Sequence, residues 1–271
     1  MNNHLVVPDE IKKHLSGDVF SALMQMPGKA FRDVRGRKTI QVALGGKSYF
    51  IKQHFGVGWA EIFKNLMTFK KPILGAMTEV NAIKKLNSIG IPTTPLVAYG
   101  QRGCNSATMQ SFVMTEDLGD IVSLEELSAD WPTYTDSFKH ALMQAVAELA
   151  SKLHGAGLCH RDFYMCHFVL KKQDLDVKNS HIQNLHLIDL HRMLHGQPSN
   201  GNAVMKDVAG LYFSAMQCGL SADDLTVFKQ SYLPQSPNFW AQVESRAQAL
   251  LTKFNSQKFQ KRLQKEKSAI R

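Results

Sequence analysis

The sequence predicts an α+β fold of two lobes, with an antiparallel sheet and helices in residues 1–118 and mostly helices in residues 119–271. Runs of apolar residues in the first part are short and separated by glycine turns, which is typical of strands. From about residue 119 the apolar residues repeat at helical spacing, first in the long run FKHALMQAVAELASKLH. With 271 residues, 44% of them hydrophobic, the chain can bury a full core in one large domain or two closely packed lobes.

The first three strands are expected to form an antiparallel meander. AFRDV, TIQVAL and SYFIKQ are joined by the turns Arg35-Gly36-Arg37 and Gly45-Gly46. Glycine at both turns suits tight connections between neighbouring strands.

Two helices and two further strands are expected next. GWAEIFKNLM and TEVNAIKKLNSIG repeat apolar residues at helical spacing, and Thr78 is a candidate cap of the second helix. A proline-containing loop follows, and then PLVAYG and SFVMTE read as strands.

Charge and cysteine usage limit the class of protein. Residues 253–271 carry seven Lys or Arg against one Glu and so supply +6 of the net charge of +9, which predicts a basic C-terminal helix. No apolar run of 18 residues and no secretory leader pattern occur, so a cytoplasmic location is expected. The four irregularly spaced cysteines suit reduced thiols rather than a disulfide framework.

The stretch CHRDFYMCHFVL contains two Cys-His pairs, which raises the question of a metal site. A structural zinc site needs two ligands two to four residues apart and then a similar pair. Cys159 and Cys166 are seven residues apart and have no partner pair elsewhere in the sequence. Zinc is therefore disfavoured, and both cysteines are interpreted as small buried residues.

The Arg-Asp between those pairs is the more informative feature. His160-Arg161-Asp162 follows a helix, and His167 comes five residues after Asp162, before the apolar run FVL. This resembles the catalytic loop of the protein-kinase-like fold, in which His-Arg-Asp is followed by four residues and then Asn. The other elements of that fold occur in order: Lys52 at the end of the third strand, Glu79 on the next strong helix, Asp189 after LHLI, and Asp207 in KDVAGLYFSA.

These residue types fit phosphoryl transfer, which needs positioning and charge neutralisation more than covalent assistance. Lys52 supplies a cation for nucleotide phosphates, Asp189 a carboxylate for Mg²⁺, and Asp162 a base for the acceptor hydroxyl. Glu79 would fix the lysine by an ion pair, although an exposed glutamate at a helix start is the alternative. Asp207 resembles the buried aspartate that holds the backbone amides of the catalytic loop, so it and His160 and Arg161 are interpreted as structural support.

The sequence departs from the usual kinase pattern in three places. It has no Gly-x-Gly-x-x-Gly, and the first hairpin offers only Gly36 among Arg35, Arg37 and Lys38. Phosphate contact there is expected from basic side chains as well as amides, the alternative being a solvated basic turn.

His167 stands where the Asn for a second Mg²⁺ is expected. Imidazole is a poor ligand for this hard ion, so either one metal suffices or His167 contacts phosphate or the loop backbone. The short interval between Asp189 and Asp207 leaves little room for an activation segment, which favours a small-molecule or carbohydrate acceptor. Backbone groups near Glu116 and Leu118, in the connection between the lobes, are expected to bind adenine.

Taken together, the blocks around Lys52, the catalytic loop, IDLHR and KDVAGLYFSA resemble the lipopolysaccharide core heptose kinases of Gram-negative bacteria. The resemblance covers roughly residues 28–220 and includes a family-specific segment at 54–76. It implies ATP and Mg²⁺ as cofactors, a lipid-linked core oligosaccharide as acceptor, and a location at the cytoplasmic face of the inner membrane. By the family's motif, Asp162 would be the base for a heptose hydroxyl.

Such an acceptor requires a transient visit to an anionic membrane surface. The basic tail and WAEIFKNLMTFKKPIL combine cations with apolar residues and are the candidate contacts. The alternatives are an ordinary core helix and a solvated tail. An acidic carrier protein is a further candidate partner for the same surface.

Three other functions compete with this interpretation. A kinase of the same fold could act on the Kdo sugar or on protein Tyr or Ser, and a nucleotide-binding pseudokinase is prompted by the absent glycine motif and by His167. A nucleic-acid-binding module is supported only by the pI near 9.3. Because the charge is largely terminal and no aromatic-basic binding motif occurs, no nucleic-acid partner is expected.

Overall fold

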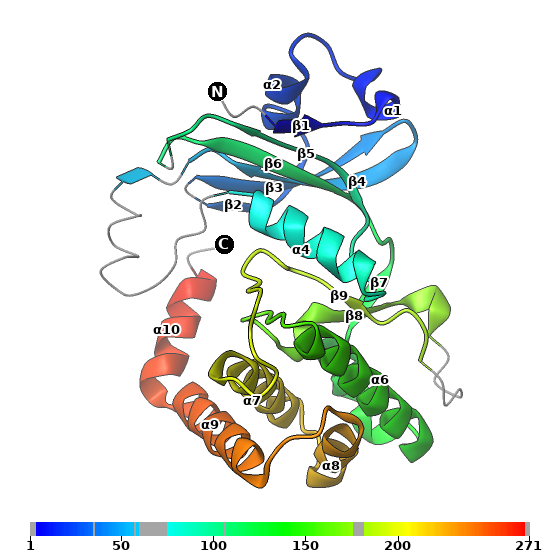
Figure 1. The fold of residues 1–271 in the computed structure, drawn as a ribbon, viewed down its shortest axis with the longest axis vertical. Coiled ribbons are helices and arrows are strands. Elements are labelled where there is room, and N and C mark those ends of the chain that lie inside the picture. The colour runs from blue at the N-terminus through cyan, green and yellow to red at the C-terminus, as the bar shows by residue number, and fades with distance from the viewer. Residues whose placement is uncertain are drawn as a thin grey trace. The chain divides into compact units, whose positions relative to one another are not determined.

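A six-stranded antiparallel sheet is built from the first part of the chain (Figure 1). Its spatial order is β1-β5-β6-β4-β3-β2. The strands are β1 (His4–Val6), β2 (Lys29–Val34), β3 (Arg37–Leu44), β4 (Lys47–His54), β5 (Leu96–Arg102) and β6 (Gln110–Glu116).

The meander β2-β3-β4 confirms the strands expected from the glycine turns. β3 and β4 pair without interruption from Arg37 opposite His54 to Leu44 opposite Lys47. β2 and β3 pair with one irregularity, a β-bulge between Ala30 and Arg32. An extra residue at a bulge changes which side chain faces which side of the sheet.

The two faces of this sheet bear different helices. The short helices α1 (Asp9–Lys12) and α2 (Val19–Met24) bury Ile11, Phe20 and Leu23 against Ile51 and other apolar residues of one face. Helix α4 (Met77–Ser88) contacts β5 and β6, and its Glu79 pairs with Lys52, which points away from that core because it neighbours Ile51 in the strand.

The computed structural model describes residues 4–34, 36–56, 58–59, 75–105, 107–175 and 182–268. The chain forms two compact units. Unit 1 comprises Met1–Gly119 with Asp189–Met193, and unit 2 comprises Asp120–Ile188 with Leu194–Arg271. The short segment from Asp189 thus belongs with the sheet although it lies late in the sequence.

Unit 2 is mostly helical, which together with the sheet of unit 1 confirms the predicted α+β fold class. A small antiparallel sheet accompanies its helices, in the order β7 (Ile121–Ser123), β8 (Phe168–Lys171) and β9 (His186–Leu187). The α-helices are α5 (Leu124–Leu127), α6 (Asp136–Gly155), α7 (Asn202–Gln217), α8 (Ala222–Ser231), α9 (Pro237–Asn255) and α10 (Gln257–Ser268). Short 3₁₀ helices occur at η1 (Ser128–Thr133), η2 (Met165–His167) and η3 (Lys172–Asp174).

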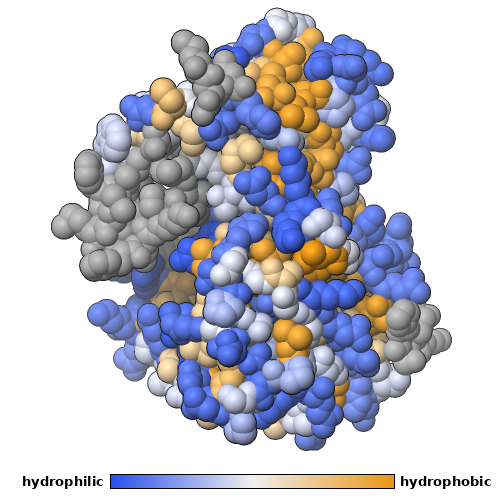
Figure 2. All heavy atoms as spheres, in the orientation of Figure 1, coloured by the Kyte–Doolittle hydropathy of each residue, from blue (hydrophilic) through white to orange (hydrophobic). Residues whose placement is uncertain are grey.

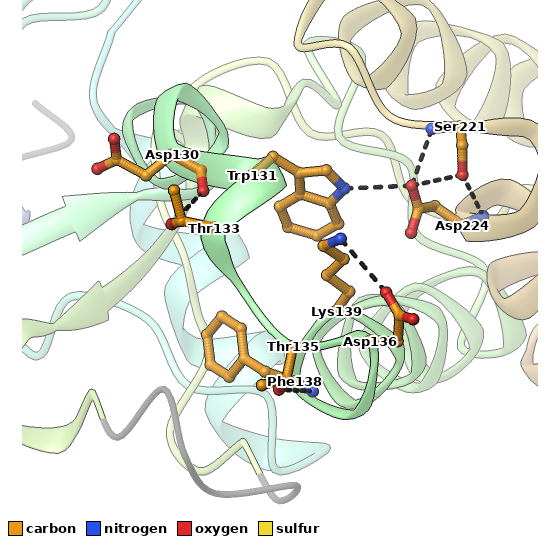
Figure 3. A network of polar contacts seen from close by, with 9 residues as sticks. All are labelled: Asp130, Trp131, Thr133, Thr135, Asp136, Phe138, Lys139, Ser221 and Asp224. Atoms are coloured by element: carbon orange, nitrogen blue, oxygen red, sulfur yellow. Dashed lines mark hydrogen bonds and ion pairs between the residues drawn. The ribbon is translucent and has the colours of Figure 1, made fainter.

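Side-chain caps fix where several of these helices begin. Thr135 accepts a hydrogen bond from the Phe138 amide at the start of α6. At α8, Ser221 and Asp224 form a capping box, and Asp224 also accepts from the Trp131 indole at 3.1 Å (Figure 3). Caps of this kind satisfy amides that the helix itself leaves unpaired.

The structure can be compared with several other expectations from the sequence. The predicted C-terminal basic helix is present as α10, whereas most of the predicted helix in GWAEIFKNLM and of the segment 54–76 lies outside the described residues.

All four cysteines are free thiols. Within the described residues, none of the helices combines the length and apolar character needed to cross a membrane. On the face visible in Figure 2, hydrophilic residues predominate and an apolar area gathers over the N-terminal elements.

Candidate active site

Lys52 is held between two carboxylates on the sheet of unit 1. Its Nζ lies 2.7 Å from Oε1 of Glu79 and 3.6 Å from Oδ1 of Asp189. Burial alone would lower the pKa of Lys52, but the charges of Glu79 and Asp189 outweigh burial and raise it above the usual value for lysine. The ammonium is therefore charged and fixed in position.

Glu79 is buried, with 3% of its surface exposed, in the first turn of α4. The alternative interpretation of Glu79 as an exposed glutamate is therefore wrong. Its carboxylate gains from the positive end of the helix dipole as well as from Lys52. The second oxygen, Oε2, is buried and has no hydrogen-bond partner, so it is available as an acceptor.

Asp189 lies at the start of the late segment that joins unit 1. Its φ of 62° is in the left-handed region, which is uncommon for a residue other than glycine. His191 lies with Nδ1 2.6 Å from Oδ1 of Asp189 and fixes that carboxylate. We did not predict a role for His191, because its only sequence signal is a position two residues after Asp189.

A small cavity of about 50 Å³ lies beside these groups. It is lined by Lys52, Glu79, Asp189 and His191, together with residues of β2, β3 and β4. The lining therefore combines carboxylates and cations, as a site for Mg²⁺ and phosphate requires.

In unit 2, the loop after α6 is fixed by Asp207 of α7. Asp207 is buried and accepts hydrogen bonds from the backbone amides of His160, at 2.5 Å, and Arg161, at 2.9 Å. Arg161 has a φ of 73°, a conformation that costs about 1–3 kcal/mol and persists only where surrounding contacts enforce it. The carboxylate of Asp207 supplies such contacts, because it accepts hydrogen bonds from the two consecutive amides that lead into Arg161.

The histidines of the loop tie it to the strand that precedes Asp189. His160 donates from Nε2 to the Ile188 carbonyl at 2.9 Å, and the Ile188 amide donates to the His167 carbonyl at 3.0 Å. His167 Nδ1 donates to the carbonyl of Asp162 at 2.6 Å. These bonds fix the backbone around Asp162, whose side chain is half-buried.

A buried polar network lies behind Asp207. Nε2 of His154 is 3.5 Å from Oδ2 of Asp207, and Nδ1 of His154 is 2.7 Å from the hydroxyl of Tyr232. Potential metal-ligating atoms of His154, Cys159 and Asp207 lie within 4.8 Å of one another. Burial and the charge of Asp207 raise the pKa of Cys159 to about 12, so the thiol stays protonated, and both Asp207 oxygens already accept amides. We interpret the group as structural support.

Gly210 allows α7 to approach this loop closely. A Cβ at this position would lie 3.2 Å from the ring of Tyr164 and 3.4 Å from the carbonyl of Phe163. The close packing of α7 against the loop therefore explains why the stretch KDVAGLYFSA has a glycine here. A side chain at this position would push α7 away from the loop.

The connection at the end of β6 contains the residues expected to contact adenine. The Glu116 amide donates to the Pro95 carbonyl at 2.9 Å, so this amide is already used. Asp117, which the sequence did not indicate, accepts from Gln41, Ser48 and the Gly119 amide at 2.7–2.9 Å. Leu118 lies between Asp117 and Gly119, which are joined by the last of these hydrogen bonds. Gly36 occupies the β2–β3 turn with a φ of 80°.

The fold and these two sets of residues define a class of enzyme. An antiparallel sheet with a carboxylate-paired lysine, and a helical unit with an aspartate-anchored His-Arg-Asp loop, are features of kinase-like phosphotransferases.

Comparison with known proteins narrows this class to a family. Residues 21–232 match the lipopolysaccharide kinase (Kdo/WaaP) family. The chain is 41% identical over 231 residues to lipopolysaccharide core heptose(I) kinase WaaP of Pseudomonas aeruginosa, covering 84% of this chain and 85% of that protein. It is 37% identical over 246 residues to WaaP of Escherichia coli, covering 85% and 90% respectively. The chain belongs to the lipopolysaccharide kinase (Kdo/WaaP) family.

A solved structure agrees with this assignment. The chain resembles WaaP in complex with acyl carrier protein, with a TM-score of 0.75 and 33% identity over 91% of this chain and 99% of that one. The predicted kinase-like fold is confirmed, and the chain is a phosphotransferase.

Proposed function

We propose that this chain is an ATP-dependent kinase that phosphorylates a heptose hydroxyl of the lipopolysaccharide inner core. The observation that supports this most is the 41% identity, over 84% of the chain, to a protein named for heptose(I) phosphorylation. Phosphoryl transfer also fits the residues around Lys52 and the loop around Asp162.

In this proposal, Lys52 binds the nucleotide phosphates. Its 2.7 Å contact with Glu79 supports the role, because a fixed ammonium loses little freedom when the phosphates arrive. Backbone groups of Glu116 and Leu118 bind the adenine edge, and Gly36 lets the hairpin backbone approach the phosphates.

Asp189 holds Mg²⁺ in this proposal. Its carboxylate offers the hard oxygen ligands that Mg²⁺ prefers, and His191 fixes its orientation. When bound, Mg²⁺ neutralises charge on the phosphates. A metal role for His167 stays a prediction and would use Nε2, since Nδ1 donates to the Asp162 carbonyl.

Asp162 acts as the base. The oxygen of the acceptor hydroxyl attacks the terminal phosphorus of ATP, ADP leaves, and the hydroxyl proton passes to the Asp162 carboxylate. Asp207, His160 and Arg161 support the role of Asp162 indirectly, by holding the loop backbone in a conformation that would otherwise be unfavourable.

The proposal includes partners and a location. The acceptor is a lipid-linked core oligosaccharide, so the enzyme would act at the cytoplasmic face of the inner membrane. A related structure is described as a complex with acyl carrier protein, which supports an acidic carrier protein as a partner of this chain.

The test is ATP-dependent phosphate transfer to core lipopolysaccharide that contains heptose but lacks core phosphate. The wild-type protein is compared with Asp162→Ala and with Asp174→Ala, which removes an exposed aspartate of the same unit. Loss of the base should lower kcat by about 10²- to 10⁴-fold while ATP affinity is retained, and the control should behave like the wild type.

Analysis of the product identifies the acceptor. Phosphate on the first heptose supports the proposal, whereas phosphate on Kdo, or on protein Tyr or Ser, would contradict the acceptor and leave the kinase assignment intact. ATP binding without transfer to any of these acceptors would favour a pseudokinase.

A further inference from the structure

One face of the β2–β3–β4 meander gathers basic side chains next to Lys52. In the strand register, Arg32 is opposite Thr39 and Thr39 is opposite Lys52. Arg37 is opposite His54. Arg37 lies two residues before Thr39 in β3, and His54 lies two residues after Lys52 in β4. Because side chains alternate between faces, all five residues lie on the same face of the sheet.

The β-bulge in β2 is what brings Arg32 to this face. Ala30 pairs with Ile40, so an uninterrupted register would place Phe31 opposite Thr39. The irregularity between Ala30 and Arg32 places Arg32 there instead. Bulges commonly re-aim a side chain next to a functional site.

These side chains line the same small cavity as Lys52 and Asp189. Arg32, Arg37, Thr39 and His54 all contribute to its wall. Its volume of about 50 Å³ is room for roughly four water-sized groups, which is comparable to a single phosphate group. With Lys38 and Lys52 the lining has four cationic side chains against the carboxylates of Glu79 and Asp189, so a bound anion would be attracted.

His54 adds a neutral polar group to this wall. It is 5% exposed, and its Nδ1 is buried without a hydrogen-bond partner. A buried polar atom without a partner is costly, so a ligand that completes its hydrogen bonding would be favoured. Burial, and then the charges of Arg37, Lys52 and His191, lower the pKa of His54 to about 4, so the ring stays neutral at physiological pH.

The hairpin between β2 and β3 lacks the glycine-rich sequence that lets a backbone wrap closely around phosphates. Its turn contains only Gly36, in place of a glycine-rich loop whose amides would surround the phosphates. Guanidinium groups can replace such amides because their planar N–H pairs match phosphate oxygens in a bidentate manner.

We propose that Arg32, Arg37 and His54 form a phosphate subsite that binds the terminal phosphate of a nucleoside triphosphate and replaces the glycine-rich loop. Arg32 and Arg37 donate through their guanidinium groups, and His54 donates from Nδ1. This inference rests on the proposed function, since it deepens the description of the nucleotide site next to Lys52.

The test compares the binding of ATP, ADP and AMP, each with Mg²⁺, by titration calorimetry at fixed ionic strength. The variant carries Arg32→Gln and Arg37→Gln. A control carries Lys29→Gln and Lys85→Gln, which remove the same charge from unit 1 at residues that do not line the cavity. We expect the arginine variant to lose about 10- to 100-fold in ATP affinity, less for ADP, and at most about twofold for AMP.

A second variant tests His54 separately from charge. His54→Leu should weaken ATP binding, and His54→Asn, whose amide N–H₂ can take the position of Nδ1–H, should restore much of the affinity. Thermal unfolding of every variant identifies those that fail to fold, and the nucleotide affinities are compared among the variants that unfold cooperatively near the temperature of the wild type.

Three outcomes would overturn the subsite. One is an arginine variant that matches the lysine control for ATP, and another is an equal loss of affinity for ATP and AMP. The third is unchanged ATP affinity with a raised KM for the acceptor, which would assign the cations to an acidic group of the acceptor. If the wild type binds none of the three nucleotides, the proposed function itself fails, and that result is distinct from the other three.

Discussion

Arg161 and Asp189 share a left-handed backbone, at φ values of 73° and 62°, and both belong to the candidate site. For residues with side chains this conformation is strained, and the strain is sustained by specific contacts. For Arg161 the contacts come from Asp207, which accepts hydrogen bonds from the backbone amides of both His160 and Arg161. Asp207 therefore holds the shape of the loop that carries Asp162.

This arrangement makes Asp207→Asn an informative substitution. An amide offers only one acceptor oxygen, so one buried backbone N–H loses its partner, at about 1–3 kcal/mol of stability. Because the loop around Asp162 would relax, we expect kcat to fall at least about tenfold, with ATP affinity little changed. Transfer assays, ATP titration and thermal unfolding measure the three quantities.

The control for this substitution is Asp174→Asn, an exposed aspartate in the same unit. Retention of full kcat by Asp207→Asn, or a parallel loss of ATP affinity and kcat, would contradict a role confined to the loop.

At the scale of elements, the start of α8 depends on one buried carboxylate. Asp224 accepts from the Ser221 amide and hydroxyl, both at 2.8 Å, and its own amide donates back to the Ser221 hydroxyl at 3.2 Å (Figure 3). The same carboxylate accepts the indole N–H of Trp131 from η1. One side chain thus both caps a helix and joins it to a segment about 90 residues earlier in the sequence.

We therefore expect Asp224→Ala to destabilise unit 2 more than a simple cap substitution. Loss of the cap costs about 0.5–2 kcal/mol, and the buried indole N–H left without an acceptor adds about 1–3 kcal/mol. Chemical denaturation of the wild type and variant gives the difference in free energy of unfolding.

Asp223→Ala is the matched control, because Asp223 is an exposed acid in the same helical turn and contributes only to the helix dipole, about 0.3–1 kcal/mol. Equal destabilisation by the two substitutions would show that the contacts of Asp224 with Ser221 and Trp131 add nothing beyond charge.

Short-range sequence patterns predicted the elements that such patterns specify. Glycine turns indicated the meander, and helical periodicity indicated α4 and α6. The bulge in β2 gave no such signal, because any residue can occupy it and only pairing with β3 reveals that Arg32 is opposite Thr39. The short strands β1, β7 and β9 were likewise missed, since two or three residues carry too little periodicity.

At the scale of the whole chain, the sequence predicted the type and order of the candidate site residues and the contact of Asp207 with the loop amides, but not the further contacts behind them. Lys52, Glu79 and Asp189 were predicted from their order in the sequence. In the structure, the carboxylates of Glu79 and Asp189 both lie within ion-pair distance of Lys52. His191 and the network behind Asp207 were missed. Single histidines and tyrosines have no periodic pattern, and Tyr232 reaches His154 across 78 residues.

Helix α10 carries five Lys or Arg residues against one Glu. Phe254 at the end of α9 lies 5.9 Å from the ring of Phe213 in α7 and 5.6 Å from that of Phe259 in α10. Phe254 and Phe259 are therefore half-buried against other rings of unit 2, while Lys258, Lys261 and Lys265 are exposed. An anionic surface would meet the cations of α10 rather than its aromatic rings.

This arrangement predicts an electrostatic membrane contact without insertion. Each Lys near an anionic membrane surface contributes about 1 kcal/mol, so reversing Lys258, Lys261 and Lys265 to Glu should weaken binding to anionic vesicles by about two orders of magnitude or more. The control reverses the exposed Lys13, Lys85 and Lys152, which lowers the net charge equally at scattered positions and should have a much smaller effect. Vesicle co-sedimentation between low and physiological salt measures both, and binding of the wild type should weaken as salt rises because exposed charges are screened. If the tail variant binds like the wild type, or if wild-type binding is insensitive to salt, the contact is not made by the cations of α10.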